Sequence, residues 1–201
     1  MNGCAHHFQL ITFLLGGTLP GTARVAGLEG EVFRGNPFTE NYDIACLRAM
    51  TDENIPILYL TAHPVRVQDL GPLGEITFDR GRVTWEKRKG MTGVTSEGEV
   101  RHYPTGTDTS PRYKLGVCLR AVREGTKPLC GPEVGLAHLR AVRLAQRLPL
   151  REVPEEFRIR YREDGQDFVC VRGLEDTLRA CFDSSCLPRE LRDARECPLQ
   201  A

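Results

Sequence analysis

The chain has 201 residues, and its 27 basic and 27 acidic side chains leave it without net charge. This balance gives no overall field that would draw the protein to nucleic acid or to an anionic membrane surface, so neither is expected as a partner. Hydrophobic residues make up 40% of the sequence and charged residues 27%, which is typical of a folded globular chain and excludes general disorder. No apolar run approaches the roughly 20 residues that span a bilayer.

The cysteines indicate a reducing compartment. There are eight of them, they are spread along the chain, and no C-x-x-C pair occurs. Disulfide scaffolds are usually shorter and denser in cysteine, so most of these thiols are predicted to be small buried side chains of a cytoplasmic protein. Cys181, Cys186 and Cys197 lack the spacing of zinc ligands and are interpreted as structural. A signal peptide is not favoured, because Met1–His7 contains neither Lys nor Arg before the apolar Phe8–Leu15 segment.

The first predicted element is an amphipathic helix over residues 2–16. Asn2, His6 and Gln9 form one polar stripe, and Gly16 is a typical residue for the end of a helix. The separate apolar face consists of Cys4, Phe8, Ile11 and Leu15, widened by Leu10 and Leu14. The polar stripe therefore points either to a functional site or simply to water.

A β-rich half follows, in which alternating side chains predict strands joined by short polar turns. Gly81 and Gly98 mark two hairpin turns, and Tyr59, Thr61 and His63 share one face of the third strand. The predicted strands are Ala23–Phe33, Tyr42–Thr51, Ile57–His63, Gly74–Phe78, Arg82–Glu86, Thr92–Thr95 and Val100–Tyr103.

From Ser110 onward the period of the apolar residues becomes helical. Ser110 is a good N-cap, Pro111 suits the first turn and Gly125 ends this helix. A second helix begins at Pro132 and ends before Pro149. The predicted buried stripe of the first of these helices consists of Leu115, Cys118, Leu119 and Val122.

The last third adds two short strands, Phe157–Tyr161 and Phe168–Val171, and a short helix between Leu174 and Phe182. Because strands come in hairpins and helices are grouped, the predicted fold is α+β. We expect an open, mostly antiparallel β-sheet with helices packed on one face and no Rossmann domain. Residues 1–183 are predicted to form this domain, and residues 184–201 a polar, peripheral tail.

Several segments, taken in order, resemble the C-terminal domain of the glucose–fructose oxidoreductase / inositol dehydrogenase (Gfo/Idh/MocA) family. The first helix carries Asn2 and His6 four residues apart, followed by FLLG, where the family has an Asp and a His on a helix. The other matching segments are NPFTENYDIACLRAMTDENIPILYLTAHPV, GPLGEITFDRGRVTW, REGTKPLCGPEVGLAHLRAVRLAQ and GLEDTLRACFDSSCLPREL. In that family the whole region is an open antiparallel sheet with helices on one face.

The resemblance implies a site and a cofactor. In the family the histidine of this helix faces the sugar or polyol carbon that exchanges hydride with NAD or NADP. It therefore implies that His6 and Asn2 are catalytic residues, although the Asn lacks the charge with which the family's Asp stabilises an imidazolium. Separately, His63 follows Tyr59 and Thr61 on one strand face, and in the functional interpretation this face looks toward the substrate cleft.

Two motifs of the complete family are missing. No G-x-G-x-x-G turn, which holds the pyrophosphate of a dinucleotide, occurs in the sequence. Glu86-Lys87 is followed by Arg88 and is not the family's Glu-Lys-Pro motif, so the catalytic Lys is absent as well. We therefore expect no cofactor site in this chain alone and no turnover without a nucleotide-binding domain.

Two functions remain open. The chain is either the substrate-side and oligomerisation domain of an NAD(P)-dependent sugar or polyol oxidoreductase, completed by a nucleotide-binding domain in trans, or a stand-alone dimerisation module derived from that family. In both cases a homo-oligomer is expected through the open sheet face that carries Tyr59 and Thr61.

The candidate sites also have simpler interpretations. Cys4, His6 and His7 supply three potential metal ligands, but zinc usually takes four and these residues point to different helix faces, so no metal is expected. His63 is more simply part of a sheet face used for association. His6 is otherwise a solvated histidine of the first helical turns.

Overall fold

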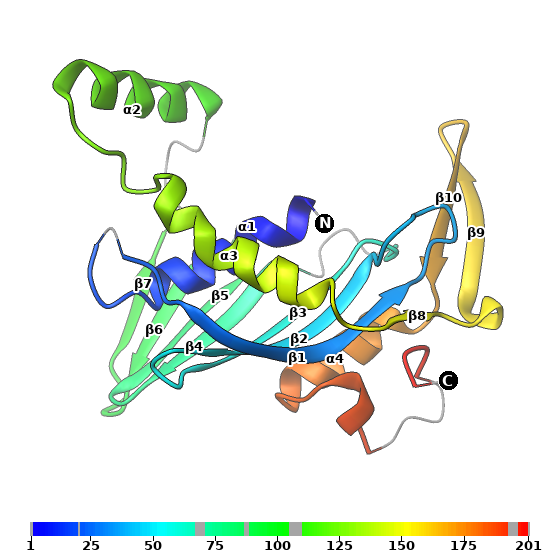
Figure 1. Ribbon diagram of the computed structural model, residues 1–201. Coiled ribbons are helices and arrows are strands. Elements are labelled where there is room, and N and C mark those ends of the chain that lie inside the picture. Colours follow the sequence, from blue (N-terminus) through cyan, green and yellow to red (C-terminus); the bar gives the residue numbers. More distant parts are fainter. Residues whose placement is uncertain are drawn as a thin grey trace. The chain divides into compact units, whose positions relative to one another are not determined.

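The computed structural model describes residues 2–19, 21–66, 71–86, 89–104, 110–192 and 197–200, without the side chains of residues 2–4. Contacts divide the chain into two compact units, one made of residues 1–66 and 129–201 and the other of residues 67–128. The elements follow one another as Figure 1 labels them.

The first unit is built on a four-stranded sheet in the order β3 (Pro56–Ala62), β2 (Ile44–Thr51), β1 (Val25–Arg34) and β8 (Leu150–Glu152). The β1–β2 and β2–β3 ladders are antiparallel, whereas β8 runs parallel to β1. Strand β8 was not predicted, because three residues between a helix and a proline are too short to display alternation.

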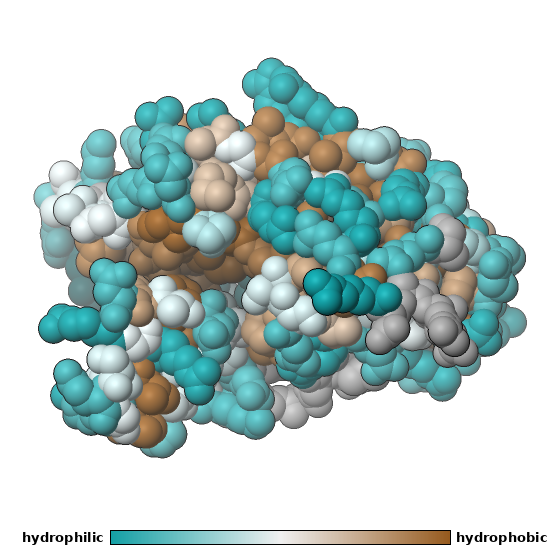
Figure 2. Space-filling view, turned by 90° about the horizontal axis from the view of Figure 1, so that it is seen from below, coloured by the Kyte–Doolittle hydropathy of each residue, from teal (hydrophilic) through white to brown (hydrophobic). Residues whose placement is uncertain are grey.

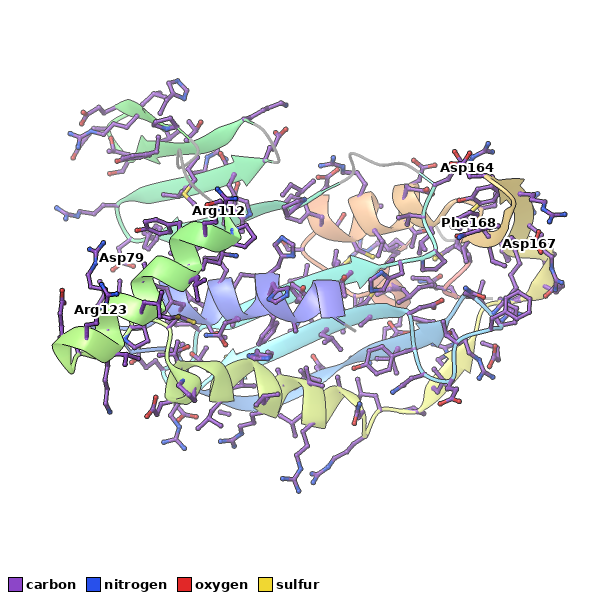
Figure 3. All side chains as sticks on the ribbon, turned by 90° about the horizontal axis from the view of Figure 1, so that it is seen from above. Asp79, Arg112, Arg123, Asp164, Asp167 and Phe168 are labelled. Atoms are coloured by element: carbon purple, nitrogen blue, oxygen red, sulfur yellow. The ribbon has the colours of Figure 1, made fainter. Side chains whose placement is uncertain are left out.

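One face of this sheet is covered by α1 (Asn2–Leu14) and α3 (Pro132–Ala145), which lie side by side in Figures 1 and 3. Strand alternation sends every second side chain of β2 to this face. The core between the helices and the sheet consists of Phe8, Val25, Val32, Tyr42, Ala45, Leu47, Ala49, Ile57, Tyr59, Ala141 and Ala145. Leu10 and Leu14 do not widen the buried face of α1 as predicted, because both remain about two-fifths exposed, at 40% and 43%.

The opposite face of the sheet is covered as well. It packs against α4 (Leu174–Asp183) and the short helix η2 (Pro188–Glu190). This second core consists of Phe33, Ile44, Cys46, Val153, Val171, Leu174, Leu178, Leu187, Cys197 and Leu199. The prediction of a peripheral tail after residue 183 is therefore wrong for Leu187, Cys197 and Leu199, which bring three apolar side chains back onto the sheet despite the polar residues between them.

A separate two-stranded sheet links β8 to α4. After the one-turn helix η1 (Glu155–Phe157) come β9 (Arg158–Glu163) and β10 (Gln166–Val171), which pair antiparallel. The turn between them has positive φ at both Asp164 (49°) and Gly165 (77°), as a tight hairpin requires. Figure 3 labels Asp164, Asp167 and Phe168 on this hairpin.

The second unit contains a four-stranded antiparallel meander of β4 (Leu73–Phe78), β5 (Gly81–Glu86), β6 (Gly90–Thr95) and β7 (Val100–Tyr103). Residues that pair across antiparallel strands share a face. The ladders thus gather large apolar side chains on one face, called here the apolar face of the second sheet: Ile76, Phe78, Val83, Trp85, Met91 and Tyr103. Phe78, Met91 and Tyr103 are 54%, 38% and 50% exposed.

Helix α2 (Pro111–Glu124) also belongs to the second unit. It begins as predicted, with the Ser110 hydroxyl accepting a hydrogen bond from the Tyr113 amide, and ends at Gly125 in the left-handed conformation. Its predicted buried stripe is wrong, because Leu115, Leu119 and Val122 are 60%, 51% and 82% exposed. Periodicity identifies an amphipathic helix but cannot say whether the described chain offers a surface to cover it.

Candidate functional site

The candidate site begins with α1, whose position is set by an aromatic contact. Phe8 is 4% exposed and packs edge-on against Tyr59 of β3, with ring centroids 5.2 Å apart. The end of the helix is fixed by Thr12, whose carbonyl accepts from the Ala23 amide at 2.8 Å. Gly16 then permits a turn that a side chain would block, because an added Cβ would lie 2.6 Å from the Gly21 carbonyl oxygen.

His6 is exposed on this helix and points away from the sheet. It precedes Phe8 by two residues, which at about 100° per residue puts the two side chains on nearly opposite sides of the helix. Phe8 contacts the sheet, so the imidazole of His6 is free to meet a group bound on the outer side of α1. Asn2, its predicted catalytic partner, lies in the same helix, but its side chain is outside the described residues.

Gln9, the third member of the predicted polar stripe, does not point to water or to a substrate. Its amide Nε2 donates to the Val134 carbonyl at 2.9 Å, and its Oε1 lies 2.9 Å from Nδ1 of His138. Because Oε1 can only accept, the His138 Nδ1 carries the proton in this bond. These two hydrogen bonds of the Gln9 amide tie α1 to α3.

This contact could not be predicted from local sequence patterns. His138 lies on α3, 129 residues along the chain from Gln9, and no local pattern relates the two. Only the packing of α1 against α3 brings them together.

His63 follows β3 and is brought beside a buried carboxylate rather than to His6. Its backbone amide donates to the Asp43 carbonyl at 2.9 Å. The Asp43 side chain, which is 7% exposed, accepts from the amides of Gly35 at 2.7 Å and Asn36 at 2.8 Å. Sequence analysis missed Asp43, since one Asp ahead of a strand has no distinctive spacing.

Burial and hydrogen bonding oppose each other at Asp43. Burial raises the pKa of this carboxyl, while the backbone amides of Gly35, Asn36 and Asp43 itself and the positive charge of His63 lower it. The amides satisfy both oxygens, so Asp43 holds the loop between β1 and β2 in place. It also sets a negative charge next to the exposed His63 imidazole, which can orient that ring.

Metal-ligating side chains do not gather in the part of the chain that the structure describes: no group of three or more His, Cys, Asp or Glu residues there could hold a metal ion. The described residues likewise include no helix long and apolar enough to cross a membrane. The basic side chains of α3, Arg140 and Arg143, are exposed, as expected for a solvated face.

The arrangement can therefore support proton transfer at two separate places. His6 presents an imidazole on the outer side of α1, and His63 presents another beside Asp43 at the end of β3. An imidazole can donate or accept a proton near neutral pH, which is the chemistry that a hydroxyl-to-carbonyl oxidation requires.

Comparison with known proteins gives matches of structure only. No protein-family model matches the sequence, and no curated protein matches it significantly. UDP-N-acetylglucosamine 3-dehydrogenase from Acidithiobacillus ferrooxidans matches with a TM-score of 0.60 at 13% identity, over 71% of this chain and 44% of that one.

Two further solved proteins match similarly. Aldose-aldose oxidoreductase from Caulobacter crescentus has a TM-score of 0.53 at 15% identity, over 71% of this chain and 43% of that one. Biliverdin reductase from Synechocystis has a TM-score of 0.53 at 14% identity, over 72% of this chain and 44% of that one.

This chain spans less than half the length of each of these proteins. At such identities the likeness concerns the fold. It confirms the α+β architecture that was predicted from the order of hairpins and helices, and it agrees with the family resemblance. The structural neighbours are Gfo/Idh/MocA-type oxidoreductases, and the chain has the fold of a part of them, as a C-terminal domain would.

Proposed function

We propose that this chain is the substrate-side and association domain of an NAD(P)-dependent sugar or polyol oxidoreductase. The observation that carries the proposal is the exposed His6 on the side of α1 turned away from the sheet. Two of the matched proteins are named for sugars, one for UDP-N-acetylglucosamine and one for aldoses. The eight cysteines fit a cytoplasmic protein, since the seven that the structure describes are free.

In this proposal, a nucleotide-binding domain acting in trans supplies the dinucleotide, and the nicotinamide supplies or accepts the hydride. His6 holds or releases the proton of the substrate hydroxyl, and Asn2, one helical turn earlier, shares its stripe. The hydrogen bonds of Gln9 hold α1 in place against α3, so that the outer side of α1 remains accessible to the substrate. His63 lines the edge of the same domain beside Asp43 and contacts more distant parts of the substrate.

The test is a fusion of this chain to the nucleotide-binding domain of a matched oxidoreductase. His6→Ala should lower kcat by about 10²–10⁴-fold, the usual contribution of a general acid or base. Asn2→Asp should raise it, because a carboxylate stabilises the imidazolium. His7→Ala, one residue along the helix, is the matched control and should leave kcat unchanged. If His6→Ala unfolds the isolated chain instead, the histidine is structural and the site is wrong.

A second candidate function is a stand-alone association module, favoured by the exposed apolar surface of the second unit. The face first expected to mediate association cannot do so through Tyr59, which is 8% exposed beneath Phe8. We place the contact between two copies on the apolar face of the second sheet instead. Figure 2 shows hydrophobic areas at the surface among hydrophilic ones, and exposed apolar patches mark interaction sites.

Sedimentation tests this second candidate. The chain should be a symmetric dimer at tens of micromolar, and Phe78→Ser with Tyr103→Ser should shift it to a monomer. Thr77→Ser, adjacent to Phe78 on the other face of β4, is the control. A monomer for the unaltered chain would contradict association through this face, while leaving the fusion experiment able to support the enzymatic role.

A further inference from the structure

The end of α4 brings two cysteines together. The Cys186 amide donates to the Cys181 carbonyl at 2.9 Å, and the Ser185 amide donates to the Phe182 carbonyl at 3.1 Å. Ser185 has a φ of 51°, in the left-handed region. This pair of hydrogen bonds around a left-handed residue is the Schellman motif, in which the first and last side chains of the turn come into contact. Here those side chains are both thiols.

The two thiols differ in their surroundings. Cys181 is fully buried, and its side chain hydrogen-bonds to that of Cys186. Cys186 is half-buried and lines a cavity of about 680 Å³ beside α4. The cavity is also lined by Thr177, Glu190 and Cys197, and the Thr177 hydroxyl lies 3.8 Å from the Cys197 sulfur. Small molecules from solution can thus reach Cys186 but not Cys181.

We propose that Cys181 and Cys186 are a redox modification site, forming a reversible disulfide when a peroxide enters this cavity. Cys186 reacts first: its sulfur takes one oxygen from hydrogen peroxide as the O–O bond breaks, which gives a sulfenic acid and one water. The Cys181 sulfur then attacks the Cys186 sulfur. The S–S bond forms as the S–O bond breaks, and the hydroxide that leaves takes the Cys181 proton as a second water.

The second step is the slow one. Burial, together with the smaller effects of the nearby Cys186 and Cys197, raises the pKa of the Cys181 thiol to about 12. Among the residues that the structure describes, the titratable groups that interact with Cys181 are these two cysteines, Cys46 of β2 and Glu31 of β1. None of them is a cation that would stabilise a thiolate, so the attacking form of Cys181 is scarce at neutral pH and increases about tenfold per pH unit.

The position of this cap is important because the C-terminal segment follows it directly. Leu187, directly after this cap, is buried against the first sheet, and so is Leu199 near the end of the chain. A disulfide across the cap fixes the geometry at which that segment leaves α4. Oxidation therefore acts on the anchoring of the C-terminal segment rather than on His6.

The experiment uses the full chain with the exposed Cys118 and Cys130 changed to Ser, so that no disulfide links two molecules through them. After treatment with hydrogen peroxide and alkylation of free thiols, peptide mapping should find Cys181 joined to Cys186, reversibly by dithiothreitol. The disulfide should form about tenfold faster at pH 8 than at pH 7.

Two variants separate the steps. Cys181→Ser should stop at a sulfenic acid on Cys186 that dimedone traps, whereas Cys186→Ser should leave Cys181 unoxidised. A disulfide joining Cys186 to Cys197, or no disulfide in a chain that circular dichroism shows to be folded, would overturn the proposal. The disulfide is mapped in the chain that retains both Cys181 and Cys186, so the test gives a result even if either variant misfolds.

Discussion

The ring of Phe8 meets the ring of Tyr59 edge-on, with 5.2 Å between the ring centroids and 87° between the ring planes. Edge-to-face packing at this distance is a favourable arrangement of two aromatic rings. It ties the N-terminal helix to the third strand and buries both side chains. This single contact also removes Tyr59 from the surface that its strand pattern had suggested for association.

We expect Phe8→Ala to lower the free energy of unfolding by about 3–5 kcal/mol, the usual loss when a buried Phe is truncated. Leu14→Ala, at a 43% exposed position of the same helix, should change it by no more than about 0.5 kcal/mol. Urea unfolding of both variants measures the difference. Equal effects at the two positions would show that α1 does not depend on the contact with Tyr59.

Gly30 and Gly27 make a matched pair on β1. A Cβ added at Gly30 would lie 2.3 Å from the Cys46 carbonyl oxygen, and its φ of 152° is one that side chains rarely adopt. A Cβ at Gly27 would meet nothing within 4 Å. Gly30→Ala should therefore destabilise the chain by more than about 1 kcal/mol, and Gly27→Ala should not. Thermal melting that ranks the two variants the other way would contradict the β1–β2 register.

The ion pair between Arg48 and Glu190 makes stability depend on pH. Two guanidinium nitrogens of Arg48 contact the Glu190 carboxylate at 2.9 and 2.6 Å. This hydrogen bonding, with help from the Leu187 amide, lowers the pKa of Glu190 from 4.5 to about 2. A depressed folded-state pKa means that the unfolded chain binds the proton more readily, so the contribution is complete above about pH 4.5 and is lost as the pH falls toward 2.

Glu190→Gln should accordingly flatten the decline of the melting temperature between pH 5 and pH 2, with Arg48→Met as the partner variant. The two changes should be less than additive when combined, because each removes the same interaction. A Glu190→Gln profile parallel to that of the unaltered chain would mean that this carboxylate is protonated alike in the folded and unfolded states.

The isolated chain should not bind NAD or NADP at micromolar concentration, because its sequence lacks the glycine turn that cradles a pyrophosphate. Trp85 is the single tryptophan and offers a fluorescence signal, to be checked by calorimetry with both cofactors. Saturable binding of either dinucleotide would refute the expectation and would require a cofactor site of another kind.

Local sequence patterns predicted much of the fold. Alternation located β1 to β7 to within about two residues, and the Ser110 cap with the glycine at 125 marked both ends of α2. The predicted helix from Pro132 is α3, and its buried residues, Val134, Ala137, Ala141 and Ala145, recur at helical spacing. The resemblance drawn from ordered segments likewise agrees with the fold of the solved oxidoreductases.

The predictions that were wrong all concern the burial of side chains. The α2 stripe is exposed, Tyr59 is covered, and Leu187 and Leu199 return to the core. Each depends on which surface lies opposite a given side chain, and periodicity reports only the side of an element on which that side chain sits. The candidate site divides in the same way: the helix period placed His6 away from Phe8, but no pattern related Gln9 to His138 or Asp43 to His63.

By itself, the sequence determined the elements, their polarity and the absence of a dinucleotide turn, because helix and strand periods, caps and glycine motifs are local properties of the chain. The tertiary structure decided that the first sheet is covered on both faces, that Gln9 belongs to the packing of α1 on α3, and that Cys181 faces Cys186. These contacts depend on burial and on the left-handed cap of α4. They are stabilised by packing between segments of the chain, which local sequence patterns do not reveal.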